Sequence, residues 1–375
     1  MTDLTIANTV TDLIQGDVQE HLSFSRIPLQ GDVLGLGTTT SLDNGELTFL
    51  PSPDGDSTTI WKCEAFNAGI RAVHSGDGNS NFPYVCFTRD ASSLQRPVDL
   101  STLVCSDDQP LQALIAEAIR LGRQSGELED AAIYGVRALT TWHELVITVA
   151  SKLCMGQQRR NSDLASSAPG DGLTSKNIYD LLQHFRLAAE DPANPQDPVR
   201  FLGRSLQWDC CGFFDCEPEL GRVTVPQKGA HLHIHGCSTD LRHGGHLHHE
   251  HPSTRLQQLE RLVLYPLASI SMLSSDLCVR GLEVDQQTLR FNICNEGDLD
   301  VSDIGVAVVV DDCYSDHRFL RIPWMEAGGK EQFSMPLELN IGTHDLEVIV
   351  DPHQQVIEPQ ATQANNRAHC RVTVQ

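Results

Sequence analysis

The sequence predicts an α+β protein that is mostly β and ends in a β-sandwich. Short apolar runs separated by Gly, Asp and Asn turns predict strands near both ends of the chain. Two segments between them repeat apolar residues at helical spacing. With 375 residues, 40% of them hydrophobic and 21% charged, the chain has room for about two or three folded domains with cores of their own.

The elements of the first half follow in order. Residues 5–50 alternate short apolar runs with tight turns, which predicts successive strands. Residues 106–124 predict an amphipathic helix, because Ser106 and Asp108 can cap it and Pro110 suits its first turn. Its apolar positions at helical spacing are Leu111, Leu114, Ile115, Ala118 and Ile119. Residues 131–150 are again rich in β-forming residues.

A polar insertion is expected over residues 157–200. It begins with the loop-like stretch GQQRRNSDLASSAPGDGLTS. Residues 176–191 then predict a short helix that the proline-rich DPANPQDP ends. The apolar positions of that helix are Ile178, Leu181, Leu182 and Phe185.

The last hundred residues predict a separate β domain. From residue 276 the chain is a run of short strands with turn signals and little helical pattern, as a β-sandwich requires. We therefore expect two domains, residues 1–275 and 276–375. Within the second, Asn295 and Gly297 suit a turn that ends a strand, and Asn365 and Asn366 suit a turn with left-handed backbone.

Net charge, apolar runs and cysteine usage lead to expectations about the partner, the location and the thiols of the protein. The net charge of −23 repels a phosphate backbone, so a nucleic-acid partner is not expected; the acidity fits solubility or a saline habitat as well as a basic partner. Neither an export leader nor a membrane-length apolar run is visible, so we expect a cytoplasmic protein without a membrane partner. The 12 cysteines are then expected as free thiols, and Cys210, Cys211 and Cys216 lack zinc-knuckle spacing.

Histidines are concentrated in one short segment, GAHLHIHGCSTDLRHGGHLHHEH. In a strand over residues 230–235, Leu232 and Ile234 alternate with His231, His233 and His235, so the imidazoles share one face. Gly244 and Gly245 allow a tight reversal that returns the histidine after them to that face. We interpret His248, His249 and His251 as surface residues.

Three neutral imidazoles on one ion leave coordination positions open, which is typical of a catalytic rather than a closed structural site. Two other interpretations of the segment are a metal-buffering tract, which would bind several ions weakly, and a solvated loop.

Two separated motifs resemble those of the acetolactate decarboxylase family: HLHIHGCSTDLRHGGHL and, nearer the N-terminus, GDVLGLGTTTSLDNGEL. GFFDCEPELGRVTVPQKGAHLH and AAIYGVRAL are similar to further parts of that family, so the resemblance extends over residues 5–270. It implies a mixed sheet with a β-barrel, and Zn²⁺ or another divalent transition metal on His231, His233 and His246. It also implies that Glu46 lies beside the metal as the catalytic acid, although the position of Glu46 after a turn is by itself typical of a solvated carboxylate.

The same resemblance leaves the substrate clamp open. Family members carry an arginine soon after the central strand, which we expect to hold the substrate carboxylate, but TTWHELVITVASK contains none. Arg137, Arg159 and Arg160 are weak candidates to replace it. The glutamate near the family's C-terminus has no assignable equivalent here.

The implied activity is that of a lyase that decarboxylates a small 2-hydroxy-3-keto acid, such as acetolactate to acetoin. Another chelating oxo or hydroxy acid is an alternative substrate. A rival hypothesis is a catalytically silent metal-binding member of the fold that serves as a scaffold.

Residues 276–375 resemble the CARDB domain, an immunoglobulin-like module. The matching segments are DLCVRGLEV, FNICNEGDLDVSD, GTHDLEVIVDPHQQVIEP and QANNRAHCRVTV. The resemblance implies an interaction surface for a protein, a glycan or a second copy of the chain. Such modules are common in exported proteins, which conflicts with the cytoplasmic expectation.

Overall fold

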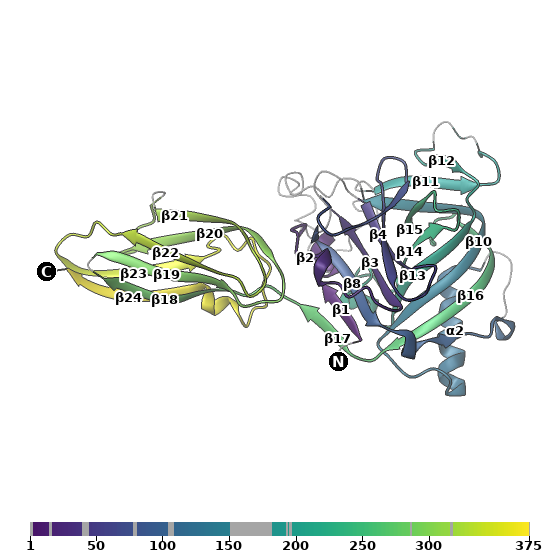
Figure 1. Ribbon diagram of the computed structural model, residues 1–375, viewed down its shortest axis with the longest axis horizontal. Helices are drawn as coiled ribbons and strands as arrows, with labels where there is room; N and C mark the ends of the chain where they lie inside the picture. The colour runs from purple at the N-terminus through teal and green to yellow at the C-terminus, as the bar shows by residue number, and fades with distance from the viewer. Residues whose placement is uncertain are drawn as a thin grey trace. The chain divides into compact units, whose positions relative to one another are not determined.

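The structure is a computed structural model of the chain (Figure 1). It describes residues 3–14, 17–39, 45–77, 81–103, 109–150, 182–192, 194, 197–285, 287–315 and 318–374. The predicted caps Ser106 and Asp108, the loop-like stretch over residues 156–175, and Arg159, Arg160, Ile178 and Leu181 lie outside the described residues.

The chain divides into two compact units. The N-terminal unit comprises Met1–Val18 and Leu22–Met272, and the C-terminal unit comprises Gln19–His21 and Leu273–Gln375. In the described part of the chain both are built mainly of strands, which confirms the predicted mostly β class.

The N-terminal unit contains two large sheets (Figure 1). The first runs in the order β17 (Ile270–Leu273), β1 (Leu4–Ala7), β8 (Tyr84–Asp90), β3 (Val33–Thr39), β4 (Gly45–Pro51), β5 (Thr58–Cys63) and β6 (Ile70–Ala72). The second runs in the order β12 (Arg200–Gly203), β11 (Leu182–Ala188), β10 (Ile133–Ala150), β13 (Gln207–Asp215), β14 (Leu232–Ser238) and β15 (Gly244–Leu247). The remaining strands of this unit are β2 (Leu22–Ser23), which pairs with β7 (Asn81–Phe82), and β16 (Arg255–Leu267), which pairs with β10 and β9 (Arg96–Pro97).

The second sheet closes on itself through its long central strand. One half of β10 pairs with β13, and its last residues pair with β15. Because β13 pairs with β14 and β14 with β15, the strands β10, β13, β14 and β15 form a closed ring of hydrogen-bonded pairs.

Alternate residues of β13 and β14 face two different cores, as the period of two requires. Cys210 and Ile234 pack in a core with helix α2 (Leu111–Ser125). Cys211 and Cys237 pack instead against residues of the first sheet. Because His233 and His235 have the same parity as Cys237 in β14, they face the first sheet.

Helix α2 confirms the helix predicted over residues 106–124. Its buried positions are the predicted ones, namely Leu111, Leu114, Ile115, Ala118 and Ile119. It ends where Gly126 takes a left-handed backbone conformation. The other helices that the structure describes are α1 (Val10–Ile14) and the 3-10 turns η1 (Phe24–Arg26), η2 (Ser92–Leu94), η3 (Leu100–Thr102), η4 (Pro218–Leu220) and η6 (Gln363–Asn366).

The helix predicted over residues 176–191 is wrong in its described part. Leu182–Ala188 is strand β11, paired antiparallel with the end of β10. Phe185 and Leu187 lie in the core on alternate positions, so burial against a neighbouring strand overrides the helical spacing of a short apolar run.

The C-terminal unit is a β-sandwich, as predicted. One sheet runs in the order β18 (Leu277–Asp285), β19 (Thr288–Asn295) and β22 (Lys330–Pro336). The other runs in the order β21 (Phe319–Met325), β20 (Val301–Val310), β23 (Gly342–Val350) and β24 (Arg367–Val374). Residues of both sheets, such as Phe291 and Val348, share one buried core.

Of the turns predicted at the two asparagine motifs of this unit, one is confirmed and one is wrong. Strand β19 ends at Asn295, whose buried amide donates to the carbonyls of Leu299 and Glu326, so a turn follows as predicted. The left-handed conformation predicted for Asn365 and Asn366 is wrong, because both lie in the 3-10 turn η6. Their amides hold that turn by donating to the carboxylates of Asp276 and Glu358.

Two further expectations concern thiols and membranes. The described cysteines are free, and Cys210 and Cys211 point to opposite faces of β13, so they cannot share a metal ion with Cys216. Among the described helices, none combines the length and the apolar character that crossing a bilayer requires.

Candidate metal centre

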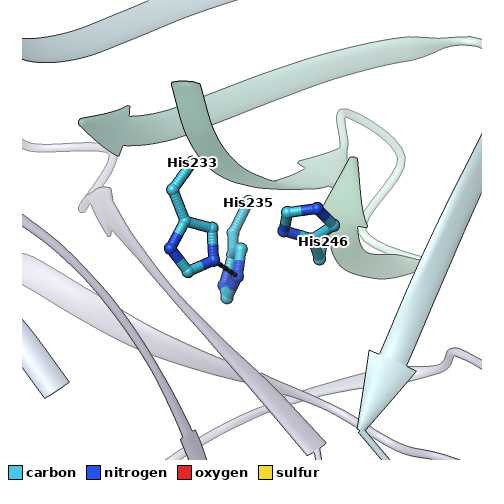
Figure 2. Close-up of side chains that lie close together, drawn as sticks. All are labelled: His233, His235 and His246. Carbon is cyan, nitrogen blue, oxygen red and sulfur yellow. Dashed lines mark hydrogen bonds between the residues drawn. The ribbon is translucent and has the colours of Figure 1, made fainter. Parts of the chain in front are cut away.

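Three histidine side chains converge on one space in the N-terminal unit (Figure 2). His233 and His235 come from β14, and His246 comes from β15. One ring nitrogen of each lies within 4.8 Å of the others. Among the described residues, this is the group of three or more ligating side chains that is close enough to hold a metal ion.

Strand geometry explains why these three meet. His233 and His235 are two residues apart in one strand and therefore share a face. His235 is directly opposite His246 in the antiparallel pairing of β14 with β15. Directly opposed residues also point to one face, so the pairing places the third ring beside the other two.

Gly244 and Gly245 serve this arrangement through close packing rather than through the reversal itself, which lies before them at residues 239–243. A Cβ atom on Gly244 would approach Ile70 to 2.6 Å, and one on Gly245 would approach the carbonyl of Thr148 to 2.9 Å. The backbone of Gly245 also has a φ of +152°, which favours glycine. Both glycines let β15 lie close to its neighbours.

Hydrogen bonds fix which nitrogen the rings of His233 and His235 offer. Nδ1 of His233 is 2.6 Å from the carbonyl oxygen of Val223, and Nδ1 of His235 is 2.8 Å from that of Leu47. A carbonyl oxygen only accepts, so each Nδ1 carries the proton and donates it. In the neutral rings each Nε2 therefore presents a lone pair, as a metal ligand must.

The two Nε2 atoms lie 3.1 Å apart. Because neither can donate while both Nδ1 atoms hold their protons, the two lone pairs repel each other unless a positive centre lies near them. Burial also disfavours an extra proton: it lowers the pKa of His233 to about 4, and the pKa values of His235 and His246 lie well below their usual range. The donor set thus fits a divalent transition metal such as Zn²⁺, with room for further ligands.

Glu46 lies at the start of β4 and borders the histidines. Its Oε2 is 3.8 Å from Nε2 of His235, and its Oε1 accepts a hydrogen bond of 2.9 Å from the backbone N–H of Ala150. Burial raises the pKa of Glu46 to about 8, against the opposing effect of the Ala150 hydrogen bond. Burial thus favours the protonated form of this carboxyl group, which is the form that a proton donor needs.

His231 does not join this group. It precedes β14, its Nδ1 donates to the carbonyl of Asp215 at 2.8 Å, and its ring stacks on Phe214 at 5.2 Å between centroids. The predicted trio of His231, His233 and His246 is thus corrected to His233, His235 and His246. The sequence did place His235 on the shared face, but it does not show that His235 is the residue opposite His246.

The other histidines of the segment are less exposed than predicted. His249 is only 5% exposed and its Nε2 lies 3.1 Å from the carbonyl oxygen of Leu232, so its interpretation as a surface residue is wrong. His248 and His251 are partly buried, with ring centroids 5.2 Å apart.

Arg137 is fully engaged inside the protein. Its guanidinium donates to Asp32 and to the backbone carbonyls of Val33 and Phe49, at 2.7 to 2.9 Å. The side chain is 4% exposed. These contacts tie β10 to β3 and β4, and they leave Arg137 unsuited to clamp a substrate, so this candidate is corrected.

Comparisons with known proteins return both families to which the motifs point. Residues 277–369 match the family model CARDB. The structure is similar to that of alpha-acetolactate decarboxylase from Bacillus subtilis strain 168, with 15% identity, a TM-score of 0.42, and coverage of 72% of this chain and 87% of that one. For acetolactate decarboxylase from Bacillus subtilis subspecies spizizenii the values are 16%, 0.43, 72% and 88%.

The C-terminal unit has its own structural match. The CARDB domain of a Pyrococcus furiosus protein, solved in complex with di-metal ions, is 18% identical with a TM-score of 0.22, covering 27% of this chain and 93% of that one. No curated protein sequence matches the chain.

Proposed function

We propose that the N-terminal unit holds Zn²⁺ or another divalent transition metal on His233, His235 and His246 and is a carbon–carbon lyase. Its substrate would be a 2-hydroxy-3-keto acid such as acetolactate, which would give acetoin. One observation carries the proposal: three imidazole nitrogens within 4.8 Å of one another face one space beside the buried carboxyl group of Glu46. A closed structural site has no use for such an acid.

Each residue of the site has a defined part. The carbonyls of Val223 and Leu47 hold the rings of His233 and His235 so that Nε2 points inward. A bound divalent ion supplies a Lewis acid, which polarises the oxygens of a chelating substrate. Glu46, held by the N–H of Ala150, gives its proton to the carbon from which carbon dioxide has left.

The choice of substrate rests on the sequence motifs that resemble the acetolactate decarboxylase family. Three protein ligands would leave coordination positions open for a chelating ligand, and other chelating oxo or hydroxy acids suit such a site as well. Carbon dioxide release from a panel of 2-hydroxy-3-keto acids tests this choice. If the metal-loaded protein releases none from any of them, the decarboxylase assignment fails.

Substitution of Glu46 by glutamine tests the acid. Glu46→Gln should keep the metal, since glutamine preserves the shape, but should lower turnover by about 10²- to 10⁴-fold, the usual contribution of a general acid. Glu117→Gln is the matched control, because Glu117 lies exposed on α2 and pairs with Arg120. Unchanged turnover in Glu46→Gln would remove Glu46 from the mechanism.

A second candidate function is a metal-binding scaffold without catalysis. It is favoured by the use of Arg137 inside the core, which removes one candidate for a carboxylate clamp. In that case the protein would bind one ion tightly, release no carbon dioxide, and act through its C-terminal unit, for which we propose a role in binding a protein, a glycan or a second copy of the chain.

A further inference from the structure

Among the residues that the structure describes, the buried hydroxyl of Thr148 in β10 finds no hydrogen-bond partner. The residue is 1% exposed. Buried hydroxyls are nearly always hydrogen-bonded, and one that is not reduces the stability of the folded protein. An unsatisfied group of this kind therefore calls for an explanation in terms of something that binds to it.

The pairing of strands places this hydroxyl at the histidine site. Thr148 is directly opposite His246 in the antiparallel pairing of β10 with β15. Side chains of directly opposed residues point to one face, with Cβ atoms about 4.5–5.5 Å apart. The neighbours of Thr148 in β10, Ile147 and Val149, pack in the core on the other face with α2. Both observations direct Thr148 to the face that carries the histidines.

The acid of the site is held by the same end of β10. Ala150, two residues after Thr148 and on the same face, donates its N–H to Glu46. The Thr148 hydroxyl is thus flanked by His246 across the strand pair and by the backbone that fixes the Glu46 carboxyl along the strand. A ligand held by the three histidines would therefore bind on the face of the sheet that carries Thr148.

The type of donor limits the type of ligand atom. The buried arginines that the structure describes are engaged elsewhere, Arg137 with Asp32 and Arg186 with Glu144 and Asp197. A hydroxyl makes one directed hydrogen bond and suits a ketone or hydroxyl oxygen, whereas a carboxylate is usually held by a bidentate guanidinium.

We propose that Thr148 is a substrate-binding residue, whose Oγ1 donates a hydrogen bond to one oxygen of a small ligand that chelates through two adjacent oxygens. This inference rests on the proposed metal site and adds to it the group that orients the chelating oxygens. A competing explanation, in which the hydroxyl only holds a water molecule, makes a different prediction for ligand affinity.

The test uses the full-length protein loaded with Co²⁺ and titrated with acetohydroxamate, an anion that chelates a metal through two adjacent oxygens and has no carboxylate, while the visible spectrum of the metal is recorded. Thr148→Val should keep the metal content and melt no lower than the wild type, because an unsatisfied hydroxyl is removed. Its dissociation constant for acetohydroxamate should rise about 5- to 10-fold, as expected for the loss of one hydrogen bond from a hydroxyl. Thr148→Ser, which keeps a hydroxyl, should bind within about twofold of the wild type.

Thr141→Val is the matched control, because its hydroxyl is on the same strand but bonds to Glu260. It should leave affinity unchanged. Wild-type affinity in Thr148→Val would overturn the proposal, as would a wild-type protein that binds no cobalt. If Thr148→Val weakens acetohydroxamate while no 2-hydroxy-3-keto acid is decarboxylated, the proposed activity fails and the role of Thr148 stands.

Discussion

Replacing Arg137 by methionine distinguishes a structural arginine from a substrate clamp. The change removes four hydrogen bonds, two to Asp32 and one each to the carbonyls of Val33 and Phe49. Methionine fills much of the same volume, so the loss is mainly electrostatic. Asp32 would keep its hydrogen bonds from Tyr265 at 2.6 Å and Gln95 at 2.9 Å but would lose its counter-charge.

The expected cost follows from leaving a buried carboxylate unpaired. Removing one partner of a buried ion pair costs about 3–5 kcal/mol. A domain is stable by only about 5–15 kcal/mol, so Arg137→Met should lose a large share of the free energy of unfolding of the N-terminal unit. Changing Asp32 to Asn as well should recover part of it, because the uncompensated charge is then gone.

Urea unfolding followed by tryptophan fluorescence measures this cost. Trp142 and Trp208 are fully buried in the N-terminal unit, so their emission reports mainly on that unit. A loss below about 1 kcal/mol, together with loss of acetohydroxamate binding by the metal-loaded variant, would refute the structural role and restore Arg137 as a ligand clamp.

Two further predictions concern pH and the second unit. Burial raises the pKa of Asp32, but Arg137 and the hydrogen bonds from Tyr265 and Gln95 outweigh it, so the folded-state pKa lies below the usual range. The contribution of Asp32 to stability is therefore complete above the unfolded pKa of about 4 and is lost as pH falls through the folded-state pKa. The difference in free energy of unfolding between the wild type and Asp32→Asn, measured by urea unfolding, should shrink from pH 6 to pH 3. A constant difference would contradict this. In the C-terminal unit, Asn295→Ala leaves two carbonyls and the N–H of Gly297 without their buried partner and should cost about 2–3 kcal/mol, seen in calorimetry as a lower melting temperature of this unit. An unchanged melting temperature would show that water replaces the amide.

The sequence predicted α2 and most of the strands within residues 5–50 because their signals are local, although α1 and η1 also lie in that range and were not predicted. Tight turns punctuate residues 5–50, and the apolar stripe of α2 covers a full amphipathic helix, so neither depends on distant partners. The helix predicted over residues 176–191 was wrong at residues 182–188 for the opposite reason. Their conformation is set by pairing with β10, more than thirty residues away, which a short apolar run cannot encode.

In the candidate site too, local features could be predicted and features set by distant strands could not. The sequence placed alternate histidines on one face, which follows from the geometry of a single strand. Choosing between His231 and His235 needed the register of β14 against β15, which is fixed by packing across the sheet. Thr148 had no signal of its own, because a threonine in a β-rich segment is ordinary until its unsatisfied hydroxyl is seen opposite His246.

The metal content of three purified proteins tests the central claim most directly. After reconstitution with zinc, the wild type and His231→Ala should each hold one ion per chain, and X-ray absorption should show three imidazole nitrogens at about 2.0–2.1 Å. His235→Ala should lose the ion. A wild-type protein without bound metal, or loss of metal from His231→Ala but not from His235→Ala, would contradict the account.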